Sequence, residues 1–246
     1  MLEARHVSIS FGGLKAVDDA SLIVPPGTIT SLTGPNGAGK STLFGILSGF
    51  LEPDAGSVSF LGRDVTGLAP HRICRLGMTR TFQIVQPFAG QTLRENIAVG
   101  SHLHRAQRKA ALAHAESIAL RVGLSGRLDR PARDLTIAGR KRLELARALA
   151  TEPKLLLLDE VLAGLNPQEV SAMLAVFRSL RERGVTVIMI EHLMHAVMNV
   201  CDRVVVLDYG KKIAEGSPQV VSSDPKVVEA YLGDPKAAQR FLEEAT

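Results

Sequence analysis

The sequence predicts an α/β fold with a mostly parallel central sheet. Two short runs, LLLLD at 155–159 and VTVIMI at 185–190, are apolar almost throughout, which is typical of strands buried on both faces. An amphipathic stretch at 167–183 separates them, and strands that alternate with helices indicate a parallel sheet. The third observation is a glycine-rich segment at 34–42, which follows a short apolar stretch and opens a helical pattern at 40–48.

The N-terminal part of the chain predicts short strands joined by turns. VSISF at 7–11 and SLIV at 21–24 are each followed by turn residues, Gly-Gly and Pro-Pro-Gly respectively. SVSFLGRDV at 57–65 continues this pattern. We therefore expect an antiparallel β subdomain at the N-terminus.

The middle and the end of the chain predict further elements. The sequence over about 93–128 is alanine-rich and charged, with apolar residues at helical spacing, and predicts an inserted α-helical subdomain. VVVLDYG at 204–210 and KKIAEG at 211–216 predict a hairpin after the parallel strands. Helical patterns at 226–232 and 235–244 predict a short C-terminal tail.

The composition favours a soluble globular protein and excludes several other classes. The chain has 246 residues, of which 46% are hydrophobic and 22% are charged. Its apolar runs are far shorter than the roughly 20 residues that a membrane span needs, and its start, with an acid at Glu3, has no apolar signal region. Cys74 and Cys201 are too few for a disulfide framework or a zinc site. We expect a cytoplasmic protein.

The net charge of +4 raises the question of a nucleic-acid partner. The nearest candidate for a basic patch is the stretch at 105–109, which is short and not dense. We interpret it as a solvated helix face, and we expect no nucleic acid among the partners.

The segment GPNGAGKST fits the phosphate-binding pattern G-x-x-x-x-G-K-[ST] and lies between an apolar strand and a helix, where that pattern needs to be. Backbone N–H groups of such a loop surround the phosphates, Lys40 reaches the β- and γ-phosphates, and Ser41 is placed to ligate Mg²⁺. The alternative is a purely structural glycine turn. The motif predicts a P-loop NTPase (RecA-like) core with these nucleotide contacts: Gly34, Pro35, Asn36, Gly37, Ala38, Gly39, Lys40, Ser41 and Thr42.

Two acids end the run LLLLDE. A carboxylate at the C-terminal end of a buried parallel strand lies where ligands bind in open α/β sheets. We expect Asp159 to hold the Mg²⁺ shell and Glu160 to polarise the attacking water. The alternative is that they are strand-end acids without a role.

The ordered set GPNGAGKST, RTFQ, LLLLDE and MIEH resembles the nucleotide-binding subunits of ATP-binding cassette (ABC) transporters, over nearly the whole chain. The resemblance implies that Phe11 stacks on the adenine of ATP and that His192 hydrogen-bonds the γ-phosphate. It implies that Gln83 contacts Mg²⁺ and the attacking water, and joins the core to the helical insertion that meets the membrane subunits. ATP and Mg²⁺ are the implied cofactors.

The resemblance also implies two segments that reach a partner cassette. The loop that crosses to the partner is placed at Ala163, Gly164, Leu165 and Asn166, where asparagine stands in a position often held by aspartate. Val161 stands where the family usually has proline. This replacement of proline by valine removes no group that takes part in the chemistry. LTIAGRKRLELARAL at 135–149 occupies the place of the family signature LSGGQ, which aligns with Leu135, Thr136, Ile137, Ala138 and Gly139.

Only the first position of this signature is identical, but part of the signature's chemistry survives. The Thr136 hydroxyl can donate to a γ-phosphate oxygen, and a helix beginning near Gly139 presents free N–H groups to the partner's nucleotide. The methyl group of Ala138 is an obstruction if the family glycine is needed for a positive φ or a close approach. We expect Glu144 to pair with Arg140 and Arg147 along the helix. A plain amphipathic helix is the alternative.

The phrases FGGLKAV, IVQPF, AGLNP and DPKVVEAYLG look most like ATPases of branched-chain amino acid importers, and a close relative drives urea uptake. The implied partners are two multi-spanning membrane permease subunits, a substrate-binding protein and a second ABC ATPase, either a paralogue or another copy of this chain. The implied location is the inner face of the plasma membrane. Three alternatives stay open: an exporter ATPase such as one for lipopolysaccharide, a soluble cassette ATPase, and a regulatory partner with little turnover.

The expected organisation is a single domain over 1–246. Residues 1–83 and 153–216 form the nucleotide-binding core, 84–152 form the helical subdomain with the signature, and 217–246 form the C-terminal tail.

Overall fold

The computed structural model describes residues 1–232, and the tail helix predicted at 235–244 lies outside them. A six-stranded sheet forms the centre of the molecule, in the order β10-β9-β3-β8-β7-β6. All neighbouring strands are parallel except β10, which pairs antiparallel with β9. The predicted α/β fold with a mostly parallel sheet is confirmed. The strands are β3 (Ile29–Thr33), β6 (Met78–Arg80), β7 (Leu155–Asp159), β8 (Thr186–Ile190), β9 (Arg203–Asp208) and β10 (Lys211–Gly216).

The central sheet is buried on both faces, as its apolar runs predict. Successive residues of β7 alternate between two hydrophobic clusters: Leu155 and Leu157 pack on one face, and Leu156 and Leu158 on the other. This double burial explains why the run shows no alternation of polar and apolar residues.

A second, four-stranded antiparallel sheet has the order β2-β1-β4-β5, as predicted for the N-terminal part. Its strands β1 (Leu2–Phe11) and β2 (Leu14–Val24) extend further than the sequence indicated, and register shifts interrupt their pairing. Such shifts break the two-residue alternation on which the strand prediction depends. The remaining strands are β4 (Ala55–Phe60) and β5 (Arg63–Asp64).

Helix α1 (Lys40–Leu47) lies between the two sheets, where Leu43, Phe44 and Leu47 join the cluster formed by both. The opposite face of the central sheet packs against α6 (Pro167–Glu182) and α7 (Met194–Val200). Asn166 and Glu169 cap α6 reciprocally, with Pro167 in the first turn, which explains why this helix begins where the sequence predicted. Helix α2 (Pro70–Leu76) and strand β6 were not predicted.

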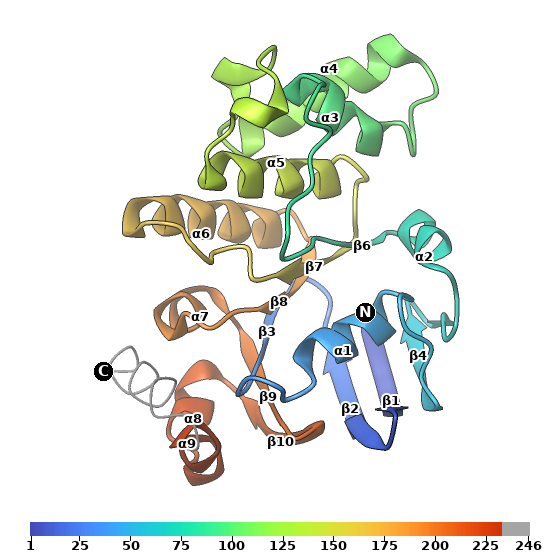
Figure 1. The fold of residues 1–246 in the computed structure, drawn as a ribbon, viewed down its shortest axis with the longest axis vertical. Helices are drawn as coiled ribbons and strands as arrows, with labels where there is room; N and C mark the ends of the chain where they lie inside the picture. The colour runs from blue at the N-terminus through green and yellow to red at the C-terminus, as the bar shows by residue number, and fades with distance from the viewer. Residues whose placement is uncertain (233–246) are drawn as a thin grey trace.

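The helical insertion stands above the core in Figure 1. It contains α3 (Leu93–Ser101) and α4 (Arg108–Arg121), and α5 (Ile137–Leu149) lies between them and the core. The basic stretch at 105–109 is partly neutralised here, because Arg105 pairs with Glu152 and Arg108 with Glu95. The chain then ends its described part with α8 (Pro218–Ser222) and α9 (Pro225–Leu232).

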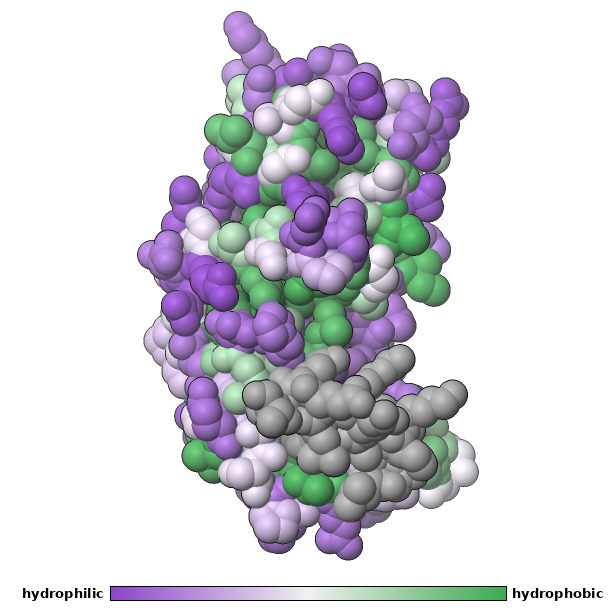
Figure 2. Space-filling view, turned by 90° about the vertical axis from the view of Figure 1, so that its left-hand side faces the viewer, coloured by the Kyte–Doolittle hydropathy of each residue, from purple (hydrophilic) through white to green (hydrophobic). Residues whose placement is uncertain are grey.

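Within residues 1–232, no helix is both long and apolar enough to cross a membrane. Figure 2 shows the side of the molecule that lies at the left in Figure 1, where hydrophilic and hydrophobic residues are interspersed in small groups.

Candidate functional site

The predicted phosphate loop lines an open cleft of about 610 Å³. The cleft lies at the C-terminal ends of the parallel strands β3 and β7, where open α/β sheets bind ligands. Glu160 and His192 line it together with part of the loop. The lining residues are Gly13, Leu14, Lys15, Ala16, Asn36, Gly37, Ala38, Gly39, Lys40, Ser41, Thr42, Glu160, His192 and Tyr209.

Two glycines of the loop are required by its geometry. Gly34 has a φ of 143°, and a Cβ there would lie 2.0 Å from the carbonyl oxygen of Leu207. Gly39 has a φ of 95°, and a Cβ there would lie 2.3 Å from the carbonyl oxygen of Ala16. Because neither position has room for a side chain, both glycines of the pattern are explained by close approach of the backbone.

Lys40 is only 6% exposed, at the start of α1. Its Nζ donates to the carbonyl oxygens of Gly34 and Pro35, both at 2.7 Å, so the ammonium lies against the loop. Burial lowers the pKa of Lys40, while the nearby charges of Glu160 and Asp159 oppose that shift. The side chain is thus held at the loop beside two carboxylates.

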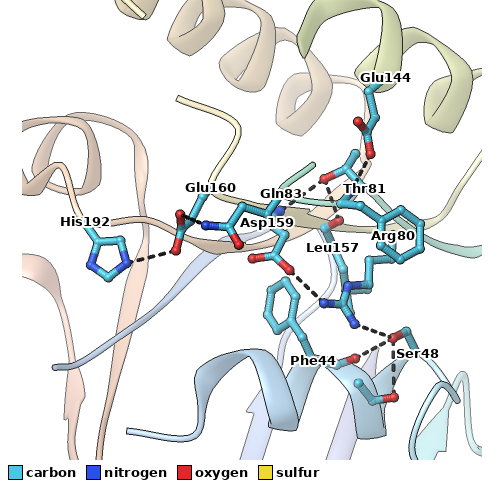
Figure 3. Close-up of polar contacts among 12 residues, drawn as sticks. Phe44, Ser48, Arg80, Thr81, Gln83, Glu144, Leu157, Asp159, Glu160 and His192 are labelled. Atoms are coloured by element: carbon cyan, nitrogen blue, oxygen red, sulfur yellow. Dashed lines mark hydrogen bonds and ion pairs between the residues drawn. The ribbon is translucent and has the colours of Figure 1, made fainter. Parts of the chain in front are cut away.

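The three residues predicted to be catalytic converge at the carboxylate of Glu160 (Figure 3). Gln83 donates from Nε2 to Oε2 at 2.7 Å. His192 Nε2 lies 3.1 Å from Oε1, to which its N–H tautomer donates. Gln83 lies 77 positions before Glu160 in the sequence, and His192 lies 32 positions after it, so these contacts join the end of β7 to distant parts of the chain. The sequence placed all three residues near the nucleotide, but it did not predict that Gln83 and His192 hold Glu160.

The backbone of Glu160 is left-handed, with a φ of 47°. For a residue that is not glycine, such a conformation costs on the order of 1–3 kcal/mol and is found at functional sites when the surroundings impose it. The side chain of Glu160 therefore points into the cleft from a strained strand end.

Glu191 is a further acidic residue beside this group, and sequence analysis did not single it out. It is 2% exposed, and its Oε1 accepts from the Leu162 N–H at 2.9 Å. Burial raises the pKa of Glu191 to about 7, and the charge of Glu160 acts in the same direction. Its position between Ile190 and the predicted His192 was the only signal available in the sequence.

Asp159 forms a buried ion pair that sequence analysis missed (Figure 3). Arg80 Nη2 donates to Asp159 Oδ2 at 2.7 Å, and the two side chains are 12% and 6% exposed. The guanidinium also lies 5.5–5.9 Å from the ring centres of three phenylalanines, Phe44, Phe50 and Phe82. The only signal was the position of Arg80 three residues before Gln83, since the pair joins residues 79 apart.

The predicted magnesium residues fit that ion. Asp159 Oδ1 has no hydrogen-bond partner in the described part of the chain, so one carboxylate oxygen stays available. Within the same residues no cluster of three or more histidines, cysteines or acids forms a protein cage for a metal. Mg²⁺ is usually held by one or two carboxylates, substrate phosphates and water, so Asp159, Ser41 and Gln83 beside bound phosphates would suit it.

Phe11 lies outside the cleft lining. It ends β1 opposite Leu14 and is 49% exposed, whereas Leu14 itself lines the cleft. The stacking of Phe11 on adenine stays a prediction, and Leu14, Lys15 and Tyr209 are lining residues that sequence analysis did not find.

The signature segment differs from its prediction in two respects. The helix predicted to begin near Gly139 begins at Ile137, because the Thr136 hydroxyl accepts from the Gly139 N–H at 3.2 Å and caps it. Ala138 is buried inside that helix without a positive φ, so the concern about a left-handed position does not apply. That its methyl group obstructs the close approach of a nucleotide stays a prediction.

The predicted local pairing of Glu144 with Arg140 is wrong. Glu144 Oε1 instead accepts from the backbone N–H of Phe82 at 2.5 Å, and Arg140 is exposed. Arg147 lies close enough to Glu144 to affect its pKa, but its guanidinium stacks 4.9 Å from the centre of the Phe88 ring. A long-range contact to the core thus replaces pairing along the helix surface.

The predicted dimer loop runs from Ala163 to Asn166 and connects the site to α6. Ala163, Gly164 and Asn166 are exposed, while Leu165 is half-buried. The Asn166 side chain accepts from the Glu169 N–H at 2.9 Å, so it caps α6. The contacts of this loop with a partner stay a prediction. Val161, in the place of the family's proline, is buried in the core.

Comparison with known proteins gives the family. The model of the ABC transporter family matches residues 17–163, and a model described as branched-chain amino acid ATP-binding cassette transporter matches residues 211–237. The high-affinity branched-chain amino acid transport ATP-binding protein BraF of Pseudomonas aeruginosa is 38% identical over 250 residues, covering 95% of this chain and 98% of that protein. The corresponding protein LivG of Escherichia coli strain K12 is 37% identical over 251 residues, with the same coverage.

Solved structures agree with this result. A nucleotide-free ATP-binding cassette from an ABC transporter has a TM-score of 0.87 and 34% identity, covering 95% of this chain and 99% of that one. The ADP conformation of an ATP-binding cassette gives the same score, identity and coverage. The chain therefore belongs to the ABC transporter family, as an ATP-binding and ATP-hydrolysing cassette.

Proposed function

We propose that this chain is the ATPase subunit of an importer of branched-chain amino acids. The observation that carries the proposal is the meeting of Gln83, His192 and Glu160 beside the phosphate loop, in a chain that matches branched-chain amino acid transport proteins over 95% of its length. The partners are two membrane permease subunits, a second cassette and a substrate-binding protein, at the inner face of the plasma membrane.

The geometry of the site supports the following route for hydrolysis. Glu160 accepts a proton from a water molecule as the water oxygen attacks the γ-phosphorus and the bond to the ADP oxygen breaks. Gln83 and His192 orient the carboxylate of Glu160, and Lys40 neutralises phosphate charge from the loop. Ser41, Asp159 and Gln83 would hold Mg²⁺, which would supply further charge neutralisation at the phosphates.

Two cassettes close around two nucleotides, each lying between one phosphate loop and the signature of the other chain. The N-terminal turn of α5 offers Thr136 and unpaired N–H groups to the partner's ATP, and the loop at 163–166 crosses the interface. Phe11 packs against the adenine. ATP shifts the pair toward the closed state because it binds that state more tightly.

An exposed apolar surface beside Gln83 suits the membrane subunits. We call it the docking patch, and it consists of Phe50, Phe82, Ile84 and Phe88, which are 52%, 44%, 74% and 44% exposed. The rings of Phe50 and Phe82 meet edge to face with centres 5.4 Å apart. The guanidinium of Arg80 lies 5.5 Å from the centre of the Phe82 ring, and that of Arg147 lies 4.9 Å from the centre of the Phe88 ring. Exposed aromatic clusters of this kind are typical of protein interfaces.

Reconstitution tests this proposal. The chain is combined with its membrane subunits, its partner cassette and the binding protein in vesicles, and ATP hydrolysis is measured with leucine, isoleucine, valine or urea. We expect a branched-chain amino acid to stimulate hydrolysis above the basal rate and to accumulate inside. Ile84→Asp should abolish that stimulation, since it places a charge in the docking patch, while the isolated variant still binds MgATP. Stimulation by urea alone, or movement of a lipid outward, would assign the chain to another transporter.

The signature leads to a second expectation, which concerns the partner cassette. We infer that a paralogue with a fuller signature completes the site of this chain, while the modified signature here completes a slower site on the paralogue. Ala138→Gly removes the methyl group next to the predicted phosphate position and should speed hydrolysis at the partner's site. Ala146→Gly, a buried alanine further along α5, is the matched control for the weakening of the helix, which is about 1 kcal/mol per glycine. No change or a loss in the Ala138 variant contradicts the inference.

A further inference from the structure

The left-handed backbone of Glu160 is held from two sides. Its N–H donates to the Ile190 carbonyl at 3.0 Å. Its own carbonyl accepts from Lys141 Nζ at 2.8 Å and, at the longer distance of 3.3 Å, from the Ala163 N–H. Such a conformation persists only where the surroundings impose it. Because hydrogen bonds weaken with distance, we expect the shortest of these contacts to contribute most to holding the backbone of Glu160. That contact comes from α5, the helix whose first turn forms the signature.

Lys141 is a buried charge, with 7% of its surface exposed. Its Nζ also lies 3.4 Å from the carbonyl oxygen of Gln83, so one ammonium joins the backbones of Glu160 and Gln83. The side chains of the same two residues meet at the cleft, 2.7 Å apart. A buried ammonium is tolerated only when it is well hydrogen-bonded, and here its acceptors are the main-chain carbonyls of the two residues to which the proposed function gives the attacking water.

Glu144 makes a related contact one turn further along α5, on the same face of the helix. Figure 3 shows it pointing from α5 toward the segment that follows β6 and carries Thr81. Its Oε1 accepts from the Phe82 N–H, while its Oε2 is buried without a hydrogen-bond partner among the described residues. Lys141 and Glu144 therefore bind a carbonyl and an N–H on either side of the Phe82–Gln83 peptide.

We propose that Lys141 is a positioning residue for Glu160. Through Lys141, the position of the signature helix α5 determines the orientation of this chain's own catalytic carboxylate, that of Glu160. The proposal rests on the proposed function, because it takes Glu160 as the group that accepts the proton of water. When α5 is seated as in this structure, Lys141 fixes the Glu160 carbonyl and the Gln83 loop together. When α5 moves with the helical subdomain, the Glu160 carbonyl loses its shortest hydrogen bond, and the Glu160 carboxylate is no longer held in the orientation that hydrolysis needs.

The test compares Lys141→Met with a matched variant on the same helix. Arg142 also donates from a basic side chain to a backbone carbonyl, that of Val122 at 3.4 Å, but it touches neither Glu160 nor Gln83. We expect Lys141→Met to lower kcat by about 10- to 100-fold, the scale set by a misplaced catalytic group, with the KM and the affinity for MgATP within twofold of the parent. Arg142→Met should keep the parent kcat within twofold. Lys141→Arg, which keeps a donor of similar reach, should restore most of the loss.

A second comparison separates positioning from general damage to the fold. In a Glu160→Gln background, Lys141→Met should lower the residual hydrolysis no further, because the group that it positions has lost its basicity. If Lys141→Met does not fold, Lys141→Gln is measured instead, with the same loss of kcat expected. The parent kcat in Lys141→Met or Lys141→Gln overturns the proposal, as does an equal loss in the Glu160→Gln background. Parent activity in Glu160→Gln alone would instead refute the role of Glu160 and thus the proposed function.

Discussion

Glu160→Gln is expected to lower kcat by about 10²- to 10⁴-fold, the usual contribution of a general base. The amide keeps the size of the carboxylate and one oxygen that can still accept from Gln83, but it no longer takes a proton from water. The affinity for MgATP should stay at the parent value, because Lys40 and the phosphate loop are unchanged. Since bound ATP then persists, the variant should accumulate as a closed dimer of cassettes. Single-turnover hydrolysis and the molar mass in the presence of MgATP measure both effects.

Glu191→Gln is the matched control for this change. Glu191 is also a glutamate at a strand end, but its carboxyl is buried against the Leu162 N–H and does not line the cleft. Because burial raises its pKa to about 7, the neutral form is already well populated at neutral pH, and the amide resembles that form. We expect its kcat to stay within an order of magnitude of the parent. If Glu160→Gln hydrolyses ATP as fast as this control, the proton acceptor is another group.

The central sheet and the phosphate loop could be predicted from the sequence because each depends on local pattern. LLLLD indicated a doubly buried strand, and the structure shows its residues alternating between two cores. The glycines of the loop were fixed by a spacing whose geometric cause is now visible at Gly34 and Gly39. By contrast, the first strand was predicted too short because register shifts near Val7 interrupt its alternation.

The polar contacts around the site could not be predicted, because they join distant parts of the chain. On the surface of an isolated helix, Glu144 would pair with Arg140 at four residues' spacing, but packing against the core gives it Phe82 as partner. Sequence analysis did not single out Lys141, although it is buried. The start of the signature helix was predicted near Gly139 for a different reason, because the capping signal of Thr136 was not used. A threonine at the N-cap by itself predicts a helix that begins at the next residue, Ile137.

The largest expected effect on stability concerns Arg80. Arg80→Met leaves the Asp159 carboxylate, whose side chain is 6% exposed, without the partner that now holds Oδ2 at 2.7 Å. Removal of one member of a buried ion pair typically costs about 3–5 kcal/mol of the free energy of unfolding. The guanidinium also contacts three aromatic rings, each worth on the order of 0.5–2 kcal/mol, although methionine recovers part of that packing. Urea unfolding without nucleotide measures the loss.

Two further variants show whether the unpaired Asp159 carboxylate causes the loss of stability in Arg80→Met. Arg147→Met removes another guanidinium that stacks on an aromatic ring, that of Phe88. Within residues 1–232 this guanidinium hydrogen-bonds only the Gln86 carbonyl, so its removal should cost about 1 kcal/mol. Adding Asp159→Asn to Arg80→Met replaces the orphaned charge by a neutral amide and should recover much of the stability, because a buried unpaired charge costs far more than a buried amide. If the Arg80 variant loses no more than the Arg147 variant, or if the double variant recovers nothing, aromatic packing and not the ion pair holds this part of the site. A large loss of stability in Arg80→Met that Asp159→Asn recovers would instead mean that the fold without nucleotide depends on Arg80 to balance the charge of Asp159. MgATP is expected to approach the same carboxylate from the other side.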